Sequence, residues 1–426
     1  MTYIDPPSRL NAVVRIPGSK SVTHRAVIAA SLANGKSVLN HFLECEDTLY
    51  TINALRKLGV MIAIDRDSLI VEGRGRSIGT GPFRGKLYLG NSGTSFRLLL
   101  SVVALCRGEF LMTGTERMKQ RPIGPLVAAL NSLGVNASCI EQEGCPPVRI
   151  RAGGIRGGRV SVSGNQSSQF LSSLLLSAPY ADADIDVEVT GRLVSSPYVD
   201  MTLQVMDQFG IRTHRDHYGW FQVSSGQGYK ARELTIPGDA SSASYFWAGA
   251  AVTGGKIVTS NIHPYTTRQG DIRFLEILER MGCIIEKASD SVTVHGGNLS
   301  GIDVDMSDLP DMVPTLAAVA LFARGRTAIR NVAHLRHKES DRLNALALEW
   351  GRIGGRVREL PDGLIIDGGA PLTGTLTDPH NDHRLAMALS VVGLRVPHLD
   401  LQDKACVEKS FPAFWRLWNP LQWNKD

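Results

Sequence analysis

A short polar turn followed by a long apolar segment recurs six times along the chain. The first two copies are PGSKSVTHRAVIAASLANG from Pro17 and LGNSGTSFRLLLSVVALCRG from Leu89. Beyond the first helical turn of each long segment, apolar residues occupy nearly every position, which predicts helices that are buried on all sides. Six such helices favour two clusters of three, one cluster in each of two domains. The other copies begin at Ser163, Pro237, Ser307 and Asp378.

The copies are evenly spaced, and a second helical pattern follows each of the first five. The turn residues of the first pattern are 72, 74, 74, 72 and 70 residues apart. The second pattern ends in a glycine in five copies, and these glycines are 75, 76, 72 and 72 residues apart. A glycine directly after a helix is typical of a left-handed C-terminal cap. The turn residues are Gly18, Gly90, Gly164, Gly238, Pro310 and His380, and the terminal glycines are Gly59, Gly134, Gly210, Gly282 and Gly354.

Short β-like segments lie between the helices. SLIVEG, VRIRAG, SVTVHGG and GLIIDGG are alternating or β-branched and end in glycine. Each repeat is therefore expected to contain strands and two helices. The sixth copy, from Phe411, lacks the terminal glycine and ends in a Trp-rich tail. Two phased series over five or six copies argue against chance Gly and Ser composition.

Composition excludes several classes of protein. The 426 residues are 43% hydrophobic and 20% charged, which is a globular balance. A net charge of +5 suggests anionic ligands, whereas 6% aromatic residues and dispersed basic residues argue against nucleic-acid binding. The longest apolar runs, such as Leu316–Ala323, are too short for a membrane span, and the N-terminus shows no signal core. Six cysteines without a CxxC pair indicate buried thiols in a reducing compartment and no metal site. We therefore expect a cytoplasmic protein.

Polar and basic residues gather at the predicted helix starts. Helix N-termini carry free N–H groups and a partial positive charge, so they bind anions such as phosphate. Basic side chains there oppose the helix dipole, which indicates function rather than stability. If the repeats pack about a pseudo-symmetry axis, their helix starts converge on one cleft. The basic residues at these starts are Lys20, Arg121, Lys338 and Lys409.

Several of the polar residues have a simpler explanation. Asp239, with Ser241 and Ser242, is expected to cap a helix. Asp47 and Asp271 are expected to be caps or surface charges, and LRHKESDRL by itself is typical of an exposed helix. Gly35-Lys36-Ser37 lacks the first glycine of a phosphate-binding loop, and no dinucleotide, zinc-hydrolase or nucleophile-elbow motif occurs.

Eleven short motifs occur in one order between residues 16 and 415. They are PGSKSVTHRA, LGNSGTSFR, RMKQRPIGPL, GNQSSQFLSSLL, LVSSPYVDMT, GDASSASYF, QGDIRF, LPDMVPTLA, HKESDRL, NDHRLAMA and KSFPAFW. In this order the motifs resemble those of the family of 5-enolpyruvylshikimate-3-phosphate synthases, also called 3-phosphoshikimate 1-carboxyvinyltransferases. The resemblance covers nearly the whole chain.

The resemblance implies an α/β (α+β) protein with the two-domain enolpyruvyl transferase fold. Each domain would hold three βαβαββ repeats, six in total. One domain would comprise residues 19–238, and the other would be discontinuous, comprising 1–18 plus 239–426. The active site would lie in the cleft between them, and closure of the domains would expel water.

The implied reaction transfers the enolpyruvyl group of phosphoenolpyruvate to the 5-hydroxyl of shikimate 3-phosphate and releases phosphate, through a tetrahedral intermediate. The family implies no metal and no cofactor, and a monomer is expected. The residues implied for phosphoenolpyruvate are Lys20, Asn91, Gly93, Arg121, Gln169, Arg342, Arg384 and Lys409. Those implied for shikimate 3-phosphate are Lys20, Ser21, Arg25, Ser167, Ser168, Gln169, Ser195, Tyr198, Asp311, His334 and Lys338.

The addition step needs one proton removed from the hydroxyl and one placed on the methylene carbon. By resemblance, Asp311 is the base and Glu339 the proton donor, with Lys20 as its partner or substitute. A carboxylate among so many cations should be ionised, which suits Asp311 as a base. A bound substrate dianion would offset this effect at Glu339.

The chain departs from the family pattern at a few positions. His24 and His334 stand where relatives have Asn, Ser92 lies within the GNSGT turn, and Leu98 replaces a Pro. Leu98 is expected to change the response to glyphosate, an inhibitor that occupies the phosphoenolpyruvate site in sensitive relatives. Gly93 is retained and leaves room for it.

Three other functions compete with this interpretation. The sister enzyme that acts on UDP-N-acetylglucosamine carries a reactive cysteine in a loop, and no cysteine here falls in a matching motif. A non-catalytic anion-binding protein would be expected to lose Asp311, Glu339 or Lys338, which are all present. An RNA-phosphate-processing enzyme of similar architecture would need a nucleotide site and a catalytic histidine, and neither is evident.

Overall fold

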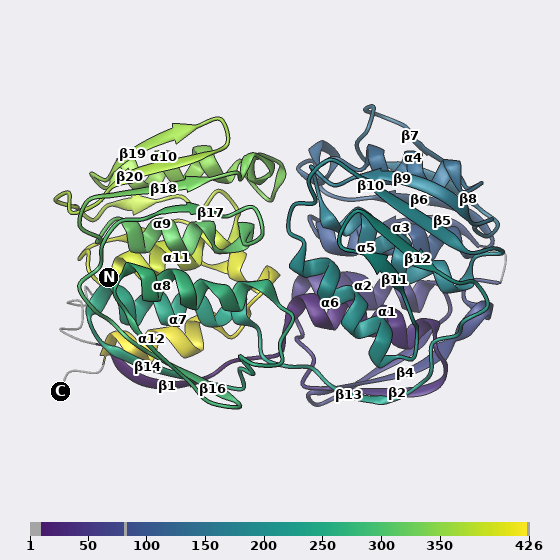
Figure 1. Ribbon diagram of the computed structural model, residues 1–426, viewed down its shortest axis with the longest axis horizontal. Helices are drawn as coiled ribbons and strands as arrows, with labels where there is room; N and C mark the ends of the chain where they lie inside the picture. The colour runs from purple at the N-terminus through teal and green to yellow at the C-terminus, as the bar shows by residue number, and fades with distance from the viewer. Residues whose placement is uncertain (1–9, 81–82, 424–426) are drawn as a thin grey trace. The chain divides into compact units, whose positions relative to one another are not determined.

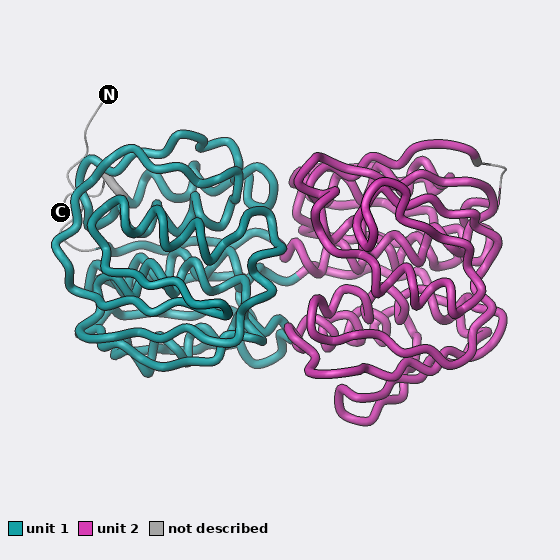
Figure 2. Tube along the Cα trace, turned by 90° about the horizontal axis from the view of Figure 1, so that it is seen from above, with its two compact units in different colours: residues 1–17, 237–426 teal, residues 18–236 magenta. Residues whose placement is uncertain are grey.

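The computed structural model describes residues 10–80 and 83–423, which divide into two compact units (Figure 2). Unit 2 is Gly18–Ile236, and unit 1 consists of the described parts of residues 1–17 and 237–426. The expected boundaries, 19–238 and 1–18 plus 239–426, differ from this division by one or two residues. The division into these two domains stays a prediction.

Within the described residues, the strands form five four-stranded sheets and one two-stranded sheet. In each four-stranded sheet, two neighbouring strands pair in parallel and an antiparallel hairpin extends the sheet, as in β5-β6-β8-β7, so the predicted βαβαββ repeat is confirmed for five of the six copies. The elements of unit 2 are α1 (Lys20–Leu32), β2 (Asn34–Asn40), α2 (Glu46–Lys57), β3 (Met61–Asp65), β4 (Ser68–Arg74), β5 (Phe83–Tyr88), α3 (Gly93–Ala104), β6 (Gly108–Thr113), α4 (Gly124–Ser132), β7 (Asn136–Cys139), β8 (Val148–Ala152), β9 (Gly158–Ser163), α5 (Ser168–Ser177), β10 (Ile185–Thr190), α6 (Pro197–Gln208), β11 (His214–Asp216), β12 (Trp220–Val223) and β13 (Glu233–Thr235).

Unit 1 repeats the same order of elements. Its members are β1 (Asn11–Arg15), α7 (Ala240–Thr253), β14 (Lys256–Ser260), α8 (Phe274–Met281), β15 (Ile284–Lys287), β16 (Ser291–His295), β17 (Asp303–Asp305), α9 (Val313–Ala320), β18 (Arg326–Arg330), α10 (Arg342–Arg352), β19 (Arg356–Leu360), β20 (Gly363–Asp367), β21 (Leu376–Thr377), α11 (His383–Gly393), β22 (Asp400–Leu401) and α12 (Phe414–Trp423).

One repeat in each unit takes its first strand from a distant part of the chain. β1 pairs in parallel with β14, about 245 residues later, and β13 pairs in parallel with β2. Both strands directly precede the two points where the chain passes from one unit to the other. Unit 1 is therefore discontinuous, because β1 from the start of the chain completes the sheet that contains β14.

The first helix of each repeat lies in the core of its unit. In unit 1, α7, α9 and α11 pack on one another, and in unit 2, α3 packs on both α1 and α5. Nearly all residues of these helices are buried. In Figure 1, α7, α9 and α11 lie between the sheet of β18 and β20 and the sheet of β1, β14 and β16. The two predicted clusters of three buried helices are confirmed.

The glycines that end the second helices adopt the predicted left-handed conformation. Their φ angles lie between 86° and 113°. The glycines are Gly59, Gly134, Gly210, Gly282 and Gly354.

Within the described residues, the sixth repeat ends at α12, its second helix, without the usual hairpin. Its sheet, β21-β22, has two strands. The rings of Phe414 and Trp418 on α12 stack 5.2 Å apart, and Trp418 lies 5.5 Å from Phe246 of α7. Aromatic side chains of the Trp-rich tail thus pack against α7. None of the helices in the described residues is both long and apolar enough to cross a membrane.

Gly18 and Gly238 are expected to tolerate no side chain, because a Cβ there would lie 2.0 and 1.9 Å from the carbonyl oxygens of His41 and Asn261. Gly18→Ala or Gly238→Ala should lower the free energy of unfolding by about 1–3 kcal/mol through overpacking. Gly351→Ala in α10, where a Cβ would meet nothing within 4 Å, is the control and should raise stability by up to about 1 kcal/mol. Denaturant unfolding measures all three, and equal stabilities would contradict the prediction.

Candidate active site

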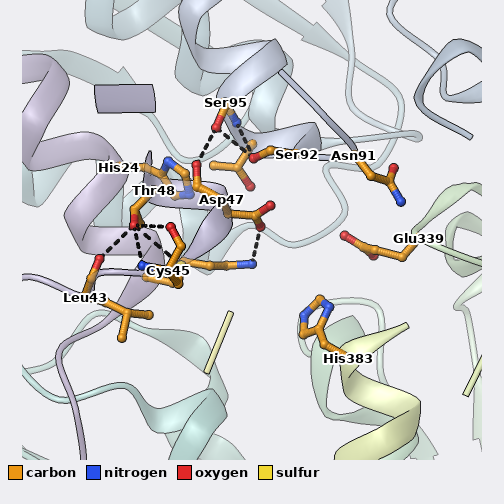
Figure 3. A network of polar contacts seen from close by, with 12 residues as sticks. His24, Leu43, Cys45, Asp47, Thr48, Asn91, Ser92, Ser95, Glu339 and His383 are labelled. Carbon is orange, nitrogen blue, oxygen red and sulfur yellow. Dashed lines mark hydrogen bonds and ion pairs between the residues drawn. The ribbon is translucent and has the colours of Figure 1, made fainter. Parts of the chain in front are cut away.

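Asp47 connects the starts of α1, α2 and α3 in unit 2 (Figure 3). Lys20 begins α1, and its Nζ lies 2.8 Å from Oδ2 of Asp47 in the first turn of α2. The main-chain carbonyl of Asp47 accepts a hydrogen bond of 2.9 Å from Ser95 of α3. Lys20 is 9% exposed and Asp47 is 2% exposed. The expectation that Asp47 is a cap or surface charge is wrong, because Cys45 occupies the cap position and the carboxylate is buried against an ammonium group.

Arg25 joins α1 to α6 from a buried position. Its Nε donates to Thr202 (2.7 Å), and its terminal nitrogens donate to the carbonyls of Ser21 (2.9 Å) and Tyr198 (3.1 Å). Burial lowers the pKa of Arg25 to about 10, so the guanidinium still carries its charge at neutral pH. Some of the N–H groups of Arg25 therefore serve to connect α1 with α6.

Hydroxyl groups line the starts of α5 and α6. Ser167 caps α5 by accepting from the Gln169 N–H (3.3 Å), and Ser168 is the first residue of that helix. Ser195 adopts a left-handed conformation with φ of 57°, two residues before α6 begins at Pro197. Such a conformation is uncommon for serine and is often found at functional sites.

Arg121 lies beside the start of α3. One of its terminal nitrogens donates to the main-chain carbonyl (3.0 Å) and the side-chain oxygen (3.3 Å) of Asn91. A Cβ at Gly93 would lie 2.6 Å from the other terminal nitrogen of Arg121. Ser92 caps α3, and Leu98 is fully buried within it. Glycine at position 93 thus allows the guanidinium to approach the helix N-terminus.

Gln169 is held by two residues of α3. Its Oε1 accepts from Arg97 (2.9 Å), and its Nε2 donates to Thr94 (3.0 Å). Arg97 also donates to the carbonyl of Pro122 (3.2 Å) and lies 5.5 Å from the ring centroid of Phe170. Arg97 therefore connects α3 with α5 and with the segment that carries Arg121.

Arg342, at the start of α10, donates hydrogen bonds to three carboxylates. Its Nε donates to Oδ2 of Asp382 (2.8 Å), and its terminal nitrogens donate to Glu339 (2.8 Å) and Asp311 (3.1 Å). The side chain is 1% exposed, and these carboxylates raise its pKa despite burial. Asp382 also caps α11 by accepting from the Arg384 N–H (3.0 Å). The segment LRHKESDRL is therefore not an exposed helix, because its last two residues, Arg342 and Leu343, are buried.

Asp311 accepts from a second arginine. Arg384 of α11 donates to Oδ2 of Asp311 (2.6 Å), and Lys338 lies 4.0 Å from Oδ1. Burial favours the neutral acid, but the charges of Arg384, Lys338 and Arg342 outweigh it and hold the pKa of Asp311 well below its usual range. Asp311 is therefore ionised at neutral pH. Arg384 also donates weakly to the hydroxyl of Tyr245 (3.4 Å).

Asp271 belongs to a buried network at the start of α7. Its carboxylate accepts from Ser241 and from Nε2 of Gln269 (3.2 Å), which also donates to Asp239 (2.6 Å). Burial, and then the negative charge of Asp311, raise the pKa of Asp271 to about 6. The expectation of a cap or surface charge is wrong for Asp271, because Arg273 precedes α8 and the carboxylate is buried. Asp239 caps α7 as predicted.

The remaining predicted residues are also buried. Burial, and then the charge of Lys338, lower the pKa of His334 to about 3, so its imidazole is neutral. Its Nε2 makes no hydrogen bond to any residue that the structure describes. Lys409 is buried at the end of a short 3-10 turn, before α12. His24 bonds Thr51 through Nδ1 (2.8 Å) inside unit 2.

Each unit thus brings some of its predicted residues together. In unit 1 Asp311 and Glu339 share Arg342, and in unit 2 Arg121 contacts Asn91 beside the start of α3. The arrangement suits polyanionic ligands and proton transfer, because guanidinium groups bind phosphate and carboxylate in pairs. Asp382 and Asp47 were not predicted as site residues, although Asp382 caps α11, which carries Arg384, and Asp47 contacts Lys20.

Comparisons with known proteins agree with one another. The model of the family described as EPSP synthase (3-phosphoshikimate 1-carboxyvinyltransferase) matches residues 4–418. A 3-phosphoshikimate 1-carboxyvinyltransferase of Syntrophobacter fumaroxidans is 45% identical over 98% of this chain and 99% of its own length. One of Vibrio vulnificus is 42% identical over 97% of this chain and 96% of its own length. A solved structure of EPSP synthase from Acinetobacter baumannii matches with a TM-score of 0.81 and 28% sequence identity, and the match covers 98% of this chain and 97% of that chain.

Asp271→Asn should change the pH dependence of stability. Because the pKa of Asp271 is raised from 3.8 to about 6, the folded state binds the extra proton, and this stabilisation is present below about pH 4 and lost as the pH rises through 6. Relative to the wild type, the variant should therefore gain up to about 2–3 kcal/mol of unfolding free energy between pH 4 and pH 8.

Denaturant unfolding at several pH values measures this change. Asp182→Asn, at an exposed carboxylate, is the control and should follow the wild-type curve. A difference between Asp271→Asn and the wild type that stays constant with pH would contradict the prediction.

Proposed function

The chain belongs to the EPSP synthase family, and we propose that the cationic side chains described above hold its two anionic substrates. The protein is a transferase of the shikimate pathway that moves the enolpyruvyl group of phosphoenolpyruvate to shikimate 3-phosphate. The observation that carries the proposal is the group of Arg342, Arg384 and Lys338 around the ionised Asp311.

Phosphoenolpyruvate carries a phosphate and a carboxylate, which two forked guanidinium groups can bind in pairs. We assign it to Arg121, Arg342 and Arg384, with Lys409 and Lys20 adding charge. Asn91, Gly93 and Gln169 complete this set, because Asn91 orients Arg121 and Gly93 leaves room beside it.

Shikimate 3-phosphate is assigned to the hydroxyl-lined helix starts. Ser167 and Ser168 at α5 and Ser195 before α6 offer hydroxyl and N–H groups to a phosphate. The remaining members of this set are Lys20, Ser21, Arg25, Gln169, Tyr198, Asp311, His334 and Lys338. Both units contribute to the proposed binding, so variants in either unit should affect turnover.

Proton transfer is assigned to Asp311 and Glu339. Asp311 takes the proton of the 5-hydroxyl while the hydroxyl oxygen bonds to C2 of phosphoenolpyruvate. Glu339, with Lys20 as partner or substitute, protonates the methylene carbon. The tetrahedral intermediate then loses a proton and phosphate to give the enol ether. The cations that depress the pKa of Asp311 are those proposed to bind substrate. Substrate anions would therefore neutralise them and make Asp311 a stronger base.

Phosphate release from phosphoenolpyruvate should depend on shikimate 3-phosphate, and Asp311→Asn or Glu339→Gln should lower kcat by about 10²–10⁴-fold. Both replacements keep the shape of the side chain, so the loss reports the missing proton transfer. Asp207→Asn, at an exposed carboxylate, is the control and should keep wild-type kcat. Release that needs UDP-N-acetylglucosamine instead would overturn the assigned substrate, and near-normal turnover in either variant would overturn that residue's role.

Gly93→Ala should raise the KM for phosphoenolpyruvate at least tenfold, because its Cβ would displace the Arg121 guanidinium. We propose that glyphosate binds the same place, so its inhibition constant should rise in the same variant. Gly153→Ala, where a Cβ would meet nothing within 4 Å, should change neither constant. Steady-state kinetics with varied phosphoenolpyruvate measures both, and a changed KM for shikimate 3-phosphate alone would contradict this assignment.

Two further expectations stay proposals. We propose that the protein acts as a monomer, and that it works in the cytoplasm.

A further inference from the structure

Glu349 is a fully buried carboxylate of α10 that takes no part in the chemistry proposed above. Its Oε2 accepts from the main-chain N–H of Asp378 (3.1 Å), and its Oε1 accepts from Nε2 of His380 (3.1 Å). A third partner, Arg352, lies 3.4 Å away and has a side chain that is 40% exposed. A buried carboxylate with these partners is bound to the turn that leads into α11.

The turn has an unusual backbone. His380 and Asn381 are consecutive non-glycine residues with φ of 53° and 52°. Left-handed conformations of this kind cost energy and persist only where surrounding contacts impose them. Within the turn, the His380 N–H donates to Asp378 (2.7 Å), and the Asp382 N–H donates to the carbonyl of Pro379 (2.9 Å).

Helix α10 holds both ends of this turn. Glu349 binds its beginning at Asp378, and Arg342 binds its end at Asp382. The two side chains are seven residues apart, so they lie on one face of the helix, about 10 Å apart along its axis. The rigid helix therefore sets the distance between the two ends of the turn.

Arg384, which is assigned to phosphoenolpyruvate, closely follows the turn. Asp382 caps α11, His383 begins it, and Arg384 binds Asp311 (2.6 Å). A shift of the turn would move Arg384 relative to Arg342 and Asp311, and displacements of about 1 Å at a binding site can lower rates greatly.

We propose that Glu349 is a positioning residue that, through His380 and the Asp378 N–H, fixes the strained turn and thereby holds Arg384 in register with Arg342. Its effect on kinetics rests on the proposed function, because Arg384 is assigned there to phosphoenolpyruvate. Its effect on the turn does not depend on that assignment.

Glu349→Ala should raise the KM for phosphoenolpyruvate at least tenfold and the KM for shikimate 3-phosphate less than twofold. Glu349→Gln retains one neutral acceptor and should give an intermediate KM, and it also serves if the alanine variant fails to fold. Arg352→Ala removes the exposed partner of Glu349 but leaves the turn intact, so it should keep wild-type constants.

Hydrogen exchange followed by mass spectrometry provides a readout that does not need activity. Peptides that cover residues 376–387 should exchange at least tenfold faster in Glu349→Ala than in the wild type and in Arg352→Ala. If Glu349→Ala lowers only the melting temperature, with both KM values and the exchange of these peptides unchanged, Glu349 is merely structural and the proposal is overturned. A wild type that releases no phosphate, together with faster exchange in the variant, would overturn the proposed function and leave the positioning of the turn supported.

Discussion

Each repeat contains a first helix that is apolar on nearly every side, and no single repeat can bury such a helix. Three repeats together can, because each helix then packs on its equivalents, as α7, α9 and α11 do. The strands before the first helices add residues to this core, such as Val160 and Val162 of β9, and a polar turn joins each of these strands to its helix. In unit 1 the starts of α10 and α11 therefore meet at Arg342, and in unit 2 the starts of α1, α2 and α3 meet at Asp47. The packing of apolar helices thus assembles the polar groups.

Assembly of the polar groups concentrates charge where water is scarce. Removing an ion from water costs several kcal/mol, so buried charges need partners. Arg342 finds them in Asp311, Glu339 and Asp382, and Lys20 finds one in Asp47. The same environment shifts two carboxylates in opposite directions, because the pKa of Asp311 falls among cations while burial and a like charge raise that of Asp271. If substrate anions bind these cations as proposed, they would redistribute the charges and link substrate binding to proton transfer.

Local patterns revealed the repeats, the buried helices and the glycine caps, because each depends on residues a few positions apart. They also marked Asp239 correctly as a cap. The same reasoning was wrong for Asp47 and Asp271, since an acidic residue near a helix start is usually a cap or is solvated. Both are instead buried by elements that arrive from elsewhere in the chain, and nothing in the neighbouring residues signals this. Glu349 lies within a helix and was not noticed at all, because its partners at Asp378 and His380 lie about thirty residues away.

The sequence by itself determined the repeat length, the order of strands and helices, the approximate position of the polar helix starts and, through eleven ordered motifs, the family. These features are encoded locally, since helical periodicity and turn preferences act over a few residues. Only the tertiary structure decided which carboxylate pairs with which cation. Lys20 and Asp47 are 27 residues apart, Arg342 and Asp382 are 40 apart, and Asp311 and Arg384 are 73 apart. The protonation of these groups is set by burial and by these distant partners, because electrostatic energies depend on separation in space and on exclusion of water rather than on separation along the chain.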